Sequence, residues 1–429
     1  MGDQPTFTLH VDQNKYLPTD GREVHAVLTV TSSGGAPADV SATEAAEVII
    51  VDTSGSMSGS KIRDARQAAA TAVETLREGA YFAVISGTGT AKVVYPGGGR
   101  LVQANQATRA EAIRAIGKLS ASGGTAIGEW LKLAGNLLSA HPNAVRHAIL
   151  MTDGQNNERD SVFESVLQAW SGRFTCDCLG IGTDWKTGEL RKVAEALLGT
   201  VEFVRNQHEL EDFFRRIIQT SMSKTVPDLA LRLWAPQGAR LVFVKQVVPE
   251  LFDLTAKRVE VNPLTGDYPI GAWGAEEREY HVCIEVPPGQ PGQEIRAGWV
   301  KLVRPDTQEE YARGNVLAQW TDDLALSTRI NNRVAHYTGQ AELNDLIQDG
   351  LSARAAGDVD GATARLGRAM KLATESGRED TARLLNRLVE VDPGSGTARL
   401  RRNVDKADEI ELDTVSVRTS RLRKSEEGS

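Results

Sequence analysis

The spacing of hydrophobic residues changes along the chain, and each change predicts a different kind of structure. In residues 6–31 apolar and polar residues alternate, as in Glu23–Val30, which is typical of β-strands with one buried face. From residue 45, continuous apolar runs such as Val48–Val51 alternate with segments whose apolar residues recur every three or four positions. These patterns predict strands buried on both faces and amphipathic helices that cover them.

The alternation of strands and helices predicts a doubly wound α/β domain with a mostly parallel sheet over residues 44–223. We expect strands at 48–52, 81–85, 91–94, 148–152, 174–181 and 201–204, and helices at 62–76, 107–119, 127–138, 162–170, 189–197 and 210–222. In folds of this kind ligands bind beyond the carboxyl ends of the strands. Polar residues that follow the strands are therefore the first candidates for a site.

Alternating patterns return after the α/β region. They predict strands at 229–234, 241–248, 258–261, 280–286 and 298–303. The N-terminal strands have no partners of their own, and a lone hairpin is only marginally stable in water. We therefore predict that residues 1–43 pair with residues 224–320, so that the α/β domain is inserted into an all-β sandwich.

The C-terminal part of the chain changes to helical spacing. Helices are expected at 323–337, 340–356, 358–376 and 379–389, which predicts a helical bundle over residues 321–391. Within residues 392–429, a Gly- and Ser-rich stretch after Pro393 is followed by runs of charge, and few residues are apolar. That composition predicts a disordered, charged tail.

Composition and charge exclude several classes of function. The chain has 49 Lys and Arg against 57 Asp and Glu, a net charge of −8, which argues against nucleic acid as a partner. Three cysteines do not make a disulfide framework, and two of them are expected as reduced core thiols. The chain shows neither a signal-peptide pattern at its start nor an apolar run long enough for a membrane span, so we expect a cytoplasmic protein.

Five oxygen-bearing side chains follow the predicted strands. Asp52, Ser54 and Ser56 come directly after the first strand of the α/β region, Thr125 lies in a Gly-rich loop, and Asp153 ends a later strand. Two carboxylates and three hydroxyls make an all-oxygen donor set, which is what a hard divalent cation such as Mg²⁺ requires. Taken singly, the same residues are also common helix caps and turn formers, and Ser56 could simply cap the following helix.

These five residues resemble the metal-ion-dependent adhesion site of the von Willebrand factor type A family, over about residues 45–222. The resemblance implies that Asp52, Ser54, Ser56, Thr125 and Asp153 hold Mg²⁺, or Mn²⁺ or Ca²⁺ in its place. It also implies that an Asp or Glu of a partner protein completes the coordination of the metal. The β region with Trp273–Tyr280 and Pro287–Gly289 looks like the accessory part of bacterial cytoplasmic members of the family.

The expected function is that of an adaptor or scaffold that is not an enzyme. The sequence holds no G-x-S-x-G, G-x-x-x-x-G-K-[ST] or H-E-x-x-H motif. One alternative is an accessory subunit of an AAA+ ATPase in chaperone or metal-insertion work, a role that the resemblance suggests. A second alternative is a Mg²⁺-dependent hydrolase that uses Asp52 and Asp153.

The tail suggests a connection to signalling by phosphorylation. Thr414 follows acidic residues and Thr419 lies among basic ones, in a stretch expected to be flexible. A phosphate there would attract an Arg-bearing reader such as a forkhead-associated domain, and the partner could also be the kinase itself. The alternative is an unmodified, solvated tail.

Overall fold

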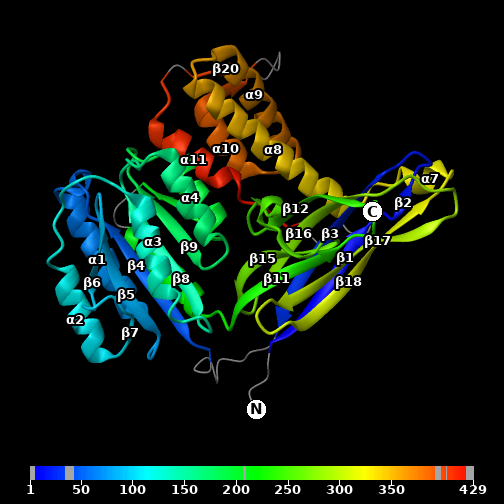
Figure 1. The fold of residues 1–429 in the computed structure, drawn as a ribbon. Helices are drawn as coiled ribbons and strands as arrows, with labels where there is room; N and C mark the ends of the chain where they lie inside the picture. Colours follow the sequence, from blue (N-terminus) through cyan, green and yellow to red (C-terminus); the bar gives the residue numbers. More distant parts are fainter. Residues whose placement is uncertain (1–4, 34–42, 206–208, 392–397, 402, 422–429) are drawn as a thin grey trace. The chain divides into compact units, whose positions relative to one another are not determined.

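The computed structural model describes residues 5–33, 43–205, 209–391, 398–401 and 403–421, which form two compact units. The first unit contains the described parts of Ser32–Leu229 together with Pro269–Ala275. The second contains Phe7–Thr31, Ala230–Tyr268 and the described residues from Glu276 onward. Figure 1 shows the elements of both units, coloured along the sequence.

The first unit is built on a seven-stranded sheet with the order β10-β9-β8-β4-β5-β6, in which β7 also pairs with β5. Its central strands β4, β5, β8, β9 and β10 are parallel, whereas β6 and β7 run antiparallel to β5. All eight residues of β4 are buried, which explains its continuous apolar run. The strands are β4 Ala45–Asp52, β5 Tyr81–Gly87, β6 Ala91–Tyr95, β7 Val102–Gln103, β8 Val145–Thr152, β9 Thr175–Ile181 and β10 Val201–Val204.

Helices cover both faces of this sheet. The helices are α1 Ser60–Thr75, α2 Gln106–Ile116, α3 Ile127–Leu138, α4 Asp160–Trp170, α5 Thr187–Ala196 and α6 Leu210–Met222, with a 3-10 turn η2 at Gly55–Met57. Ile49 and Val51 of β4 pack in one core with α1, α2 and α6, while α3, α4 and α5 follow one another along the other face. The predicted doubly wound α/β fold is therefore confirmed.

The second unit contains most of two further sheets. Their orders are β1-β3-β16-β12-β13 and β14-β15-β11-β17-β18-β2. The strands are β1 Thr6–Gln13, β2 Tyr16–Leu17, β3 Glu23–Ser33, β11 Val226–Trp234, β12 Arg240–Val248, β13 Phe252–Asp253, β14 Val259–Asn262, β15 Thr265–Trp273, β16 Glu277–Glu285, β17 Glu294–Arg304 and β18 Glu309–Trp320.

The pairing of β3 with β16 joins segments that lie on either side of the α/β domain in the sequence. Their register places Leu28 opposite Tyr280. The two sheets contact each other: the rings of Phe7 and Tyr311 lie 5.1 Å apart, and a Cβ on Gly298 would come within 2.8 Å of Ile284 Cδ1. The N-terminal strands thus find their partners in the later β region.

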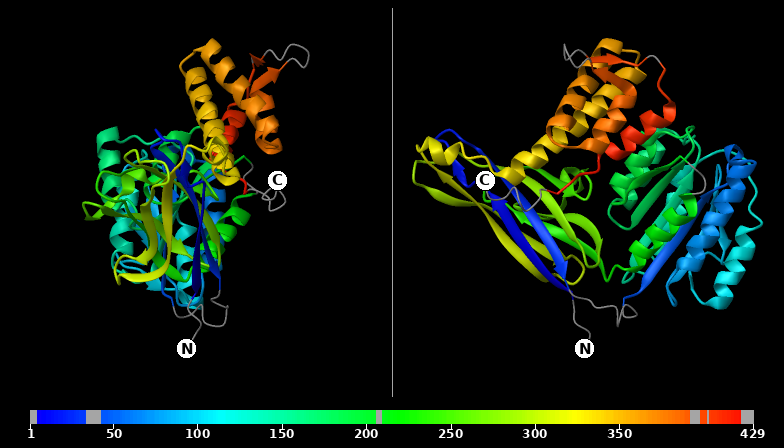
Figure 2. Two further views of the ribbon diagram at one scale, coloured as in Figure 1. Left: turned by 90° about the vertical axis from the view of Figure 1, so that its right-hand side faces the viewer. Right: turned by 180° about the vertical axis from the view of Figure 1, so that it is seen from behind.

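Helices follow the β strands in the second unit. They are α7 Leu324–Ser327, α8 Asn332–Ala355, α9 Val359–Glu375 and α10 Glu379–Leu388. Two helices were expected at 323–337 and 340–356. In the structure α8 begins at Asn332 and continues through Gly339, so it combines the end of the first expected helix with the second. The first turns of α8 pack on the sheet, where Tyr337 joins Val27 and Val247 in a small core. Figure 2 shows α8 in yellow, leading from the strands into the bundle.

The prediction of a disordered tail is wrong for residues 398–401 and 403–421. Strand β20 (Ala398–Leu400) pairs with β19 (Val389–Val391), and α11 (Lys406–Ser416) packs against α8 and α10. Leu412 is fully buried in the bundle core, and Arg387 of α10 holds Asp408 and Glu411 of α11. Ion pairs to neighbouring helices therefore offset the small number of apolar residues. The remainder of the predicted tail, 392–397, 402 and 422–429, lies outside the described residues.

The two threonines proposed as phosphorylation sites lie in this ordered segment. Thr414 is 3% exposed, and its hydroxyl donates to the carbonyl oxygen of Ile410. The Thr419 hydroxyl donates to the carbonyl oxygens of Val247 and Pro249. The expected flexibility is wrong for both, so phosphorylation of Thr414 stays a prediction that requires α11 to open first.

A buried charged triad links three strands and one helix of the α/β unit. His147 on β8 contacts Glu47 on β4 through Nδ1 at 2.7 Å and Asp177 on β9 through Nε2 at 2.9 Å. The Ser221 hydroxyl on α6 donates to the other oxygen of Glu47. Burial alone would lower the pKa of His147, but Glu47 and Asp177 outweigh it and raise that pKa well above its usual value. The imidazole is therefore charged and donates through both nitrogens.

We predict that His147→Gln destabilises the protein by about 3–5 kcal/mol, because it leaves a buried carboxylate without its cation. The stabilisation from the raised His147 pKa is complete below about pH 6.5 and declines as the pH rises toward the folded-state value. Urea unfolding at several pH values measures both effects. A variant as stable as the wild type, with the same alkaline loss of stability, would contradict this account of the triad.

Candidate metal centre

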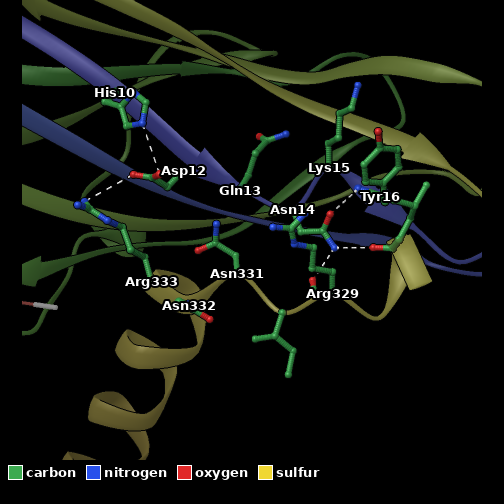
Figure 3. A pocket seen from close by; sticks show the side chains of 12 residues that line it. His10, Asp12, Gln13, Asn14, Lys15, Tyr16, Arg329, Asn331, Asn332 and Arg333 are labelled. Atoms are coloured by element: carbon green, nitrogen blue, oxygen red, sulfur yellow. Dashed lines mark hydrogen bonds and ion pairs between the residues drawn. The ribbon is translucent and has the colours of Figure 1, made fainter. Parts of the chain in front are cut away.

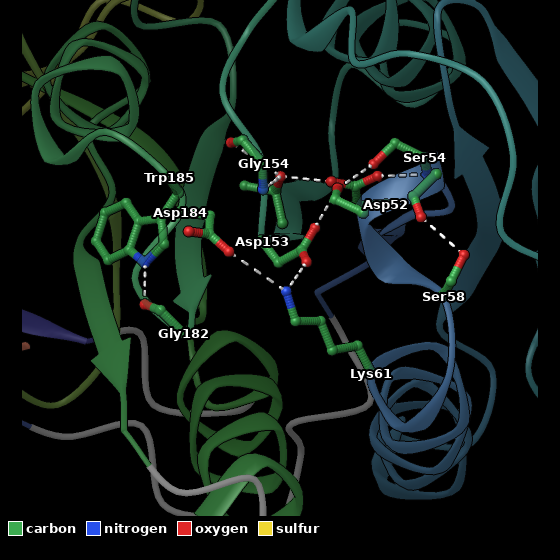
Figure 4. Close-up of polar contacts among 12 residues, drawn as sticks. Asp52, Ser54, Ser58, Lys61, Asp153, Gly154, Gly182, Asp184 and Trp185 are labelled. Carbon is green, nitrogen blue, oxygen red and sulfur yellow. Dashed lines mark hydrogen bonds and ion pairs between the residues drawn. The ribbon is translucent and has the colours of Figure 1, made fainter.

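The five oxygen-bearing residues predicted from the sequence lie on three loops at the carboxyl edge of the parallel sheet. Asp52 is the last residue of β4, and the first loop (53–59) carries Ser54 and Ser56. Thr125 lies in the second loop, immediately before α3, and Asp153 begins the third loop, after β8. Figure 4 shows the side chains around Asp52 and Asp153.

Backbone hydrogen bonds hold the three loops together. The Gly55 amide donates to the carbonyl oxygen of Gly123 at 2.9 Å, which joins the first loop to the second. Thr125 and Asn157 join the second loop to the third: the Thr125 amide donates to Asn157 Oδ1, and the Asn157 amide donates to the Thr125 carbonyl oxygen. The positions of the side chains are therefore set by main-chain contacts.

Hydroxyl groups connect the two carboxylates. Ser54 Oγ and Ser56 Oγ lie 2.9 Å apart, and the Ser56 hydroxyl donates to Asp153 Oδ1 at 2.7 Å. Asp52 accepts the Ser54 amide on one oxygen and the Thr152 hydroxyl on the other. All of these oxygens belong to one connected cluster.

Gly154 marks the space on which the oxygens converge. A Cβ at this position would lie 3.2 Å from Thr125 Oγ1, 3.3 Å from Ser56 Oγ and 3.8 Å from Asp52 Oδ2. Thr125 is thereby brought to the same place as the residues of the other two loops. The structure thus brings together all five residues that the sequence singled out.

The carboxylates are deeply buried, and this has an electrostatic cost. Asp52 and Asp153 are both 0% exposed, whereas Ser56 is exposed at the rim of the site. Burial raises the pKa of Asp52, hydrogen bonds from Thr152 and Ser54 oppose the rise, and the charge of Asp153 adds to it. Two buried carboxylates need a compensating cation nearby.

Lys61 in the first turn of α1 supplies part of that compensation. Its Nζ lies 2.5 Å from Asp153 Oδ2 and 3.8 Å from Asp184 Oδ2, which is on an exposed side chain. Neither Lys61 nor Thr152 was singled out from the sequence, although both adjoin the motif. Lys61 lies five residues beyond Ser56, at the second position of α1, and Thr152 directly precedes Asp153.

The donor set fits a divalent cation. Two carboxylates and three hydroxyls converge, every donor is a hard oxygen, and the small Gly154 leaves the shared space open. Asp52, Ser54, Ser56, Thr125 and Asp153 would hold such an ion. Among the described residues, no cysteine or histidine takes part in the hydrogen bonds of this cluster.

A second hollow, in the other unit, is polar but contains side chains that already pair with one another (Figure 3). Arg333 reaches both Asp12 and Glu279, and the Asn14 amide donates to the carbonyl oxygens of Leu326 and Arg329. Since most of these groups already pair with one another, this hollow offers a weaker donor set than the cluster at Asp52.

Comparisons with known proteins agree with the fold. The family model described as von Willebrand factor type A domain matches residues 46–203, and the one described as von Willebrand factor type A C-terminal domain matches residues 371–416. The solved structure of von Willebrand factor type A from Catenulispora acidiphila is 51% identical, with a TM-score of 0.94 over 98% of both chains.

More distant proteins share the fold or match part of the chain. The ArnB paralog VWA2 from Sulfolobus acidocaldarius shares the fold, with 14% identity and a TM-score of 0.62 over 96% of this chain and 98% of that one. An uncharacterized protein from Synechocystis sp. is 33% identical over 49% of this chain, and human inter-alpha-trypsin inhibitor heavy chain H4 is 29% identical over 46%. The matches span 50% and 23% of those two curated relatives.

None of the helices formed by the described residues combines the length and the apolar character needed to span a membrane.

We predict that Lys61→Gln binds Mg²⁺ more tightly than the wild type, by about tenfold or 1.4 kcal/mol. The reason is that the ammonium group beside Asp153 repels a cation held by the same carboxylate. Isothermal titration calorimetry measures the change. The matched control is Lys132→Gln, which removes an exposed lysine on α3, and an affinity for Mg²⁺ that stays the same or falls in Lys61→Gln would refute the prediction.

Proposed function

Because the chain belongs to the von Willebrand factor type A family, we propose that it is a metal-dependent protein-binding module that acts as an adaptor or scaffold. Domains of this family generally mediate protein–protein interaction and commonly bind a divalent metal at such a site. We propose Mg²⁺ as the ion, with Mn²⁺ and Ca²⁺ as the other hard cations that the same oxygens could hold. The convergence of five oxygen donors from three loops beside Gly154 is the observation that carries the proposal.

Charge at the site favours an anionic group on the partner. Asp52 and Asp153 neutralise a bound divalent ion, and Lys61 adds one positive charge. The ion, its two carboxylates and Lys61 then carry one positive charge together, which the exposed carboxylate of Asp184 offsets only in part, and the ion can accept a carboxylate oxygen from an incoming Asp or Glu. The serine and threonine ligands are neutral, so they do not weaken the attraction between the ion and the partner's carboxylate. Additional carboxylate ligands would cancel that attraction.

The rim of the site suggests which residues meet the partner. Ser56 is exposed, and the Asp184 side chain is 71% exposed and lies 3.8 Å from Lys61 Nζ. We propose that Lys61 and Asp184 form a pair of opposite charges that a partner reads beside the metal. Removing Asp184 should change the choice of partner more than the affinity for the ion.

We propose that the metal centre binds a partner and does not catalyse a reaction. A hydrolase would need a free acid or base beside the bound metal, whereas Asp52 and Asp153 would be ligands of the metal and Lys61, whose side chain contacts Asp153, is paired with two carboxylates. An ammonium group has no lone pair with which to accept a proton. Hydrolysis of a generic phosphate ester by the purified protein in Mg²⁺ would favour the hydrolase instead.

Asp52→Ala tests the metal site directly. We expect it to abolish Mg²⁺ binding measured by calorimetry, because it removes a fully buried carboxylate of the cluster, while the circular dichroism spectrum stays unchanged. The control is Asp212→Ala, whose side chain is 85% exposed on α6. Mg²⁺ affinity that survives in Asp52→Ala would remove these five residues as the ligand set.

Partner capture tests the function. Wild-type, Asp52→Ala and Asp212→Ala proteins are used as bait in a lysate of the native organism, each with Mg²⁺ and with EDTA. We expect a partner that wild type and Asp212→Ala retain only in Mg²⁺ and that Asp52→Ala loses; an AAA+ ATPase, a kinase or a forkhead-associated protein among the captured chains would then select the pathway. A set of bound proteins that is the same in all arms would refute metal-bridged binding.

A further inference from the structure

A group of side chains with a different chemistry lies on the second unit. Strands β3 and β16 run antiparallel, and their register places His25 directly opposite Cys283 and Glu23 opposite Glu285. Side chains two residues apart on a strand share a face, so Glu23, His25 and Cys283 lie together. The alternate residues of β3, such as Val24, are buried on the other face.

The three side chains are close enough to share one ion. His25 Nε2 lies 3.8 Å from Cys283 Sγ and 3.8 Å from Glu23 Oε2. One ligand atom of each residue lies within 4.8 Å of those of the other two. In a tetrahedral zinc site with ordinary bond lengths, neighbouring ligand atoms are separated by about 3.4–3.6 Å, so small side-chain movements suffice.

We propose that Glu23, His25 and Cys283 form a zinc site with three protein ligands and a fourth position open to water or to another ligand. Thiolate, imidazole and carboxylate are the ligand types that zinc accepts together, whereas Mg²⁺ and Ca²⁺ avoid sulfur. The site is thus chemically distinct from the all-oxygen cluster at Asp52. It also lies in the other unit of the chain.

A second histidine orients the first one. His25 Nδ1 lies 3.1 Å from Nε2 of His281. His281 precedes Cys283 by two residues and shares its face of β16. The two nitrogens lie within hydrogen-bond distance, so a neutral His281 ring can accept the His25 Nδ1–H through its Nε2. A zinc-bound histidine usually donates its other ring nitrogen in this way, which directs the free Nε2 toward the metal.

An aromatic ring fixes the second histidine in turn. Phe243 of β12 packs edge-to-face on His281, with ring centroids 4.9 Å apart. The α8 helix covers the neighbouring part of this face, where Tyr337 packs with Val27. His25 and Glu23 remain partly or fully exposed, so solvent ions can reach the three ligands.

The charges and protons of the binding step balance. The free thiol of Cys283 carries its proton, as an ordinary cysteine does at neutral pH. On binding, the sulfur forms a bond to zinc, and the S–H proton passes to the solvent. The thiolate and the Glu23 carboxylate then neutralise the two positive charges, and neutral His25 contributes a lone pair.

The experiment uses the full chain with Asp52→Ala, so that the oxygen cluster does not compete for metal. Co²⁺ replaces zinc as a spectroscopic probe, and zinc retained after dialysis is counted by atomic emission. We expect a thiolate-to-cobalt absorption band and one retained zinc per chain. Cys283→Ser should abolish the band, and His281→Gln should weaken zinc binding by about 10–100-fold.

Control variants separate this site from other thiols and histidines. His10→Gln changes a histidine whose side chain is 74% exposed and should leave the band intact. Cys176 and Cys178 remain in every variant and are fully buried in the other unit. If Cys283→Ser fails to fold, Glu23→Gln replaces it as the test and should weaken zinc binding. A band that persists in Cys283→Ser, or zinc retention that Glu23→Gln leaves unchanged, would overturn the proposal.

Discussion

The burial of two carboxylates at the ends of adjacent parallel strands is the constraint on which the α/β unit depends. Asp52 and Asp153 have no exposed surface, and each ends or follows a strand that is rich in buried apolar side chains. Placing two like charges in such surroundings costs free energy unless donors and cations surround them. Here the clustered hydroxyls and the Lys61 ammonium stabilise the two charges, and main-chain bonds between the loops hold these groups in place.

Much of this arrangement could be predicted from the sequence because two independent signals agree. Continuous apolar runs predicted parallel strands, and the ends of such strands are where Asp52 and Asp153 lie. Lys61 could not be predicted, since a lysine early in a helix looks the same whether it points to solvent or back to the sheet. The role of Gly154 could not be predicted either, because a sequence does not tell which oxygens lie where a side chain at this position would be.

The C-terminal segment shows where reasoning from composition fails. Its charged residues are typical of a solvated tail, but Arg387 and Arg354 on neighbouring helices pair with acids of α11. One fully buried leucine, Leu412, joins a core that other helices had already built. Disorder was predicted from the segment alone, whereas the ion-pair partners come from elsewhere in the chain. The match of residues 371–416 to a family model agrees with an ordered structure here.

The pairing of β3 with β16 has a consequence for how the protein is made. Thr31 and Glu277, which contact each other across these strands, are 246 residues apart. At a synthesis rate of about 5–20 residues per second, β3 waits on the ribosome for roughly 12–50 s before β16 emerges. During that interval its edge is open to pairing with other chains, because a hairpin with β1 is only marginally stable. The α/β unit, with its shorter connections, can fold first, so chaperones that act during translation would find their substrate in the N-terminal strands.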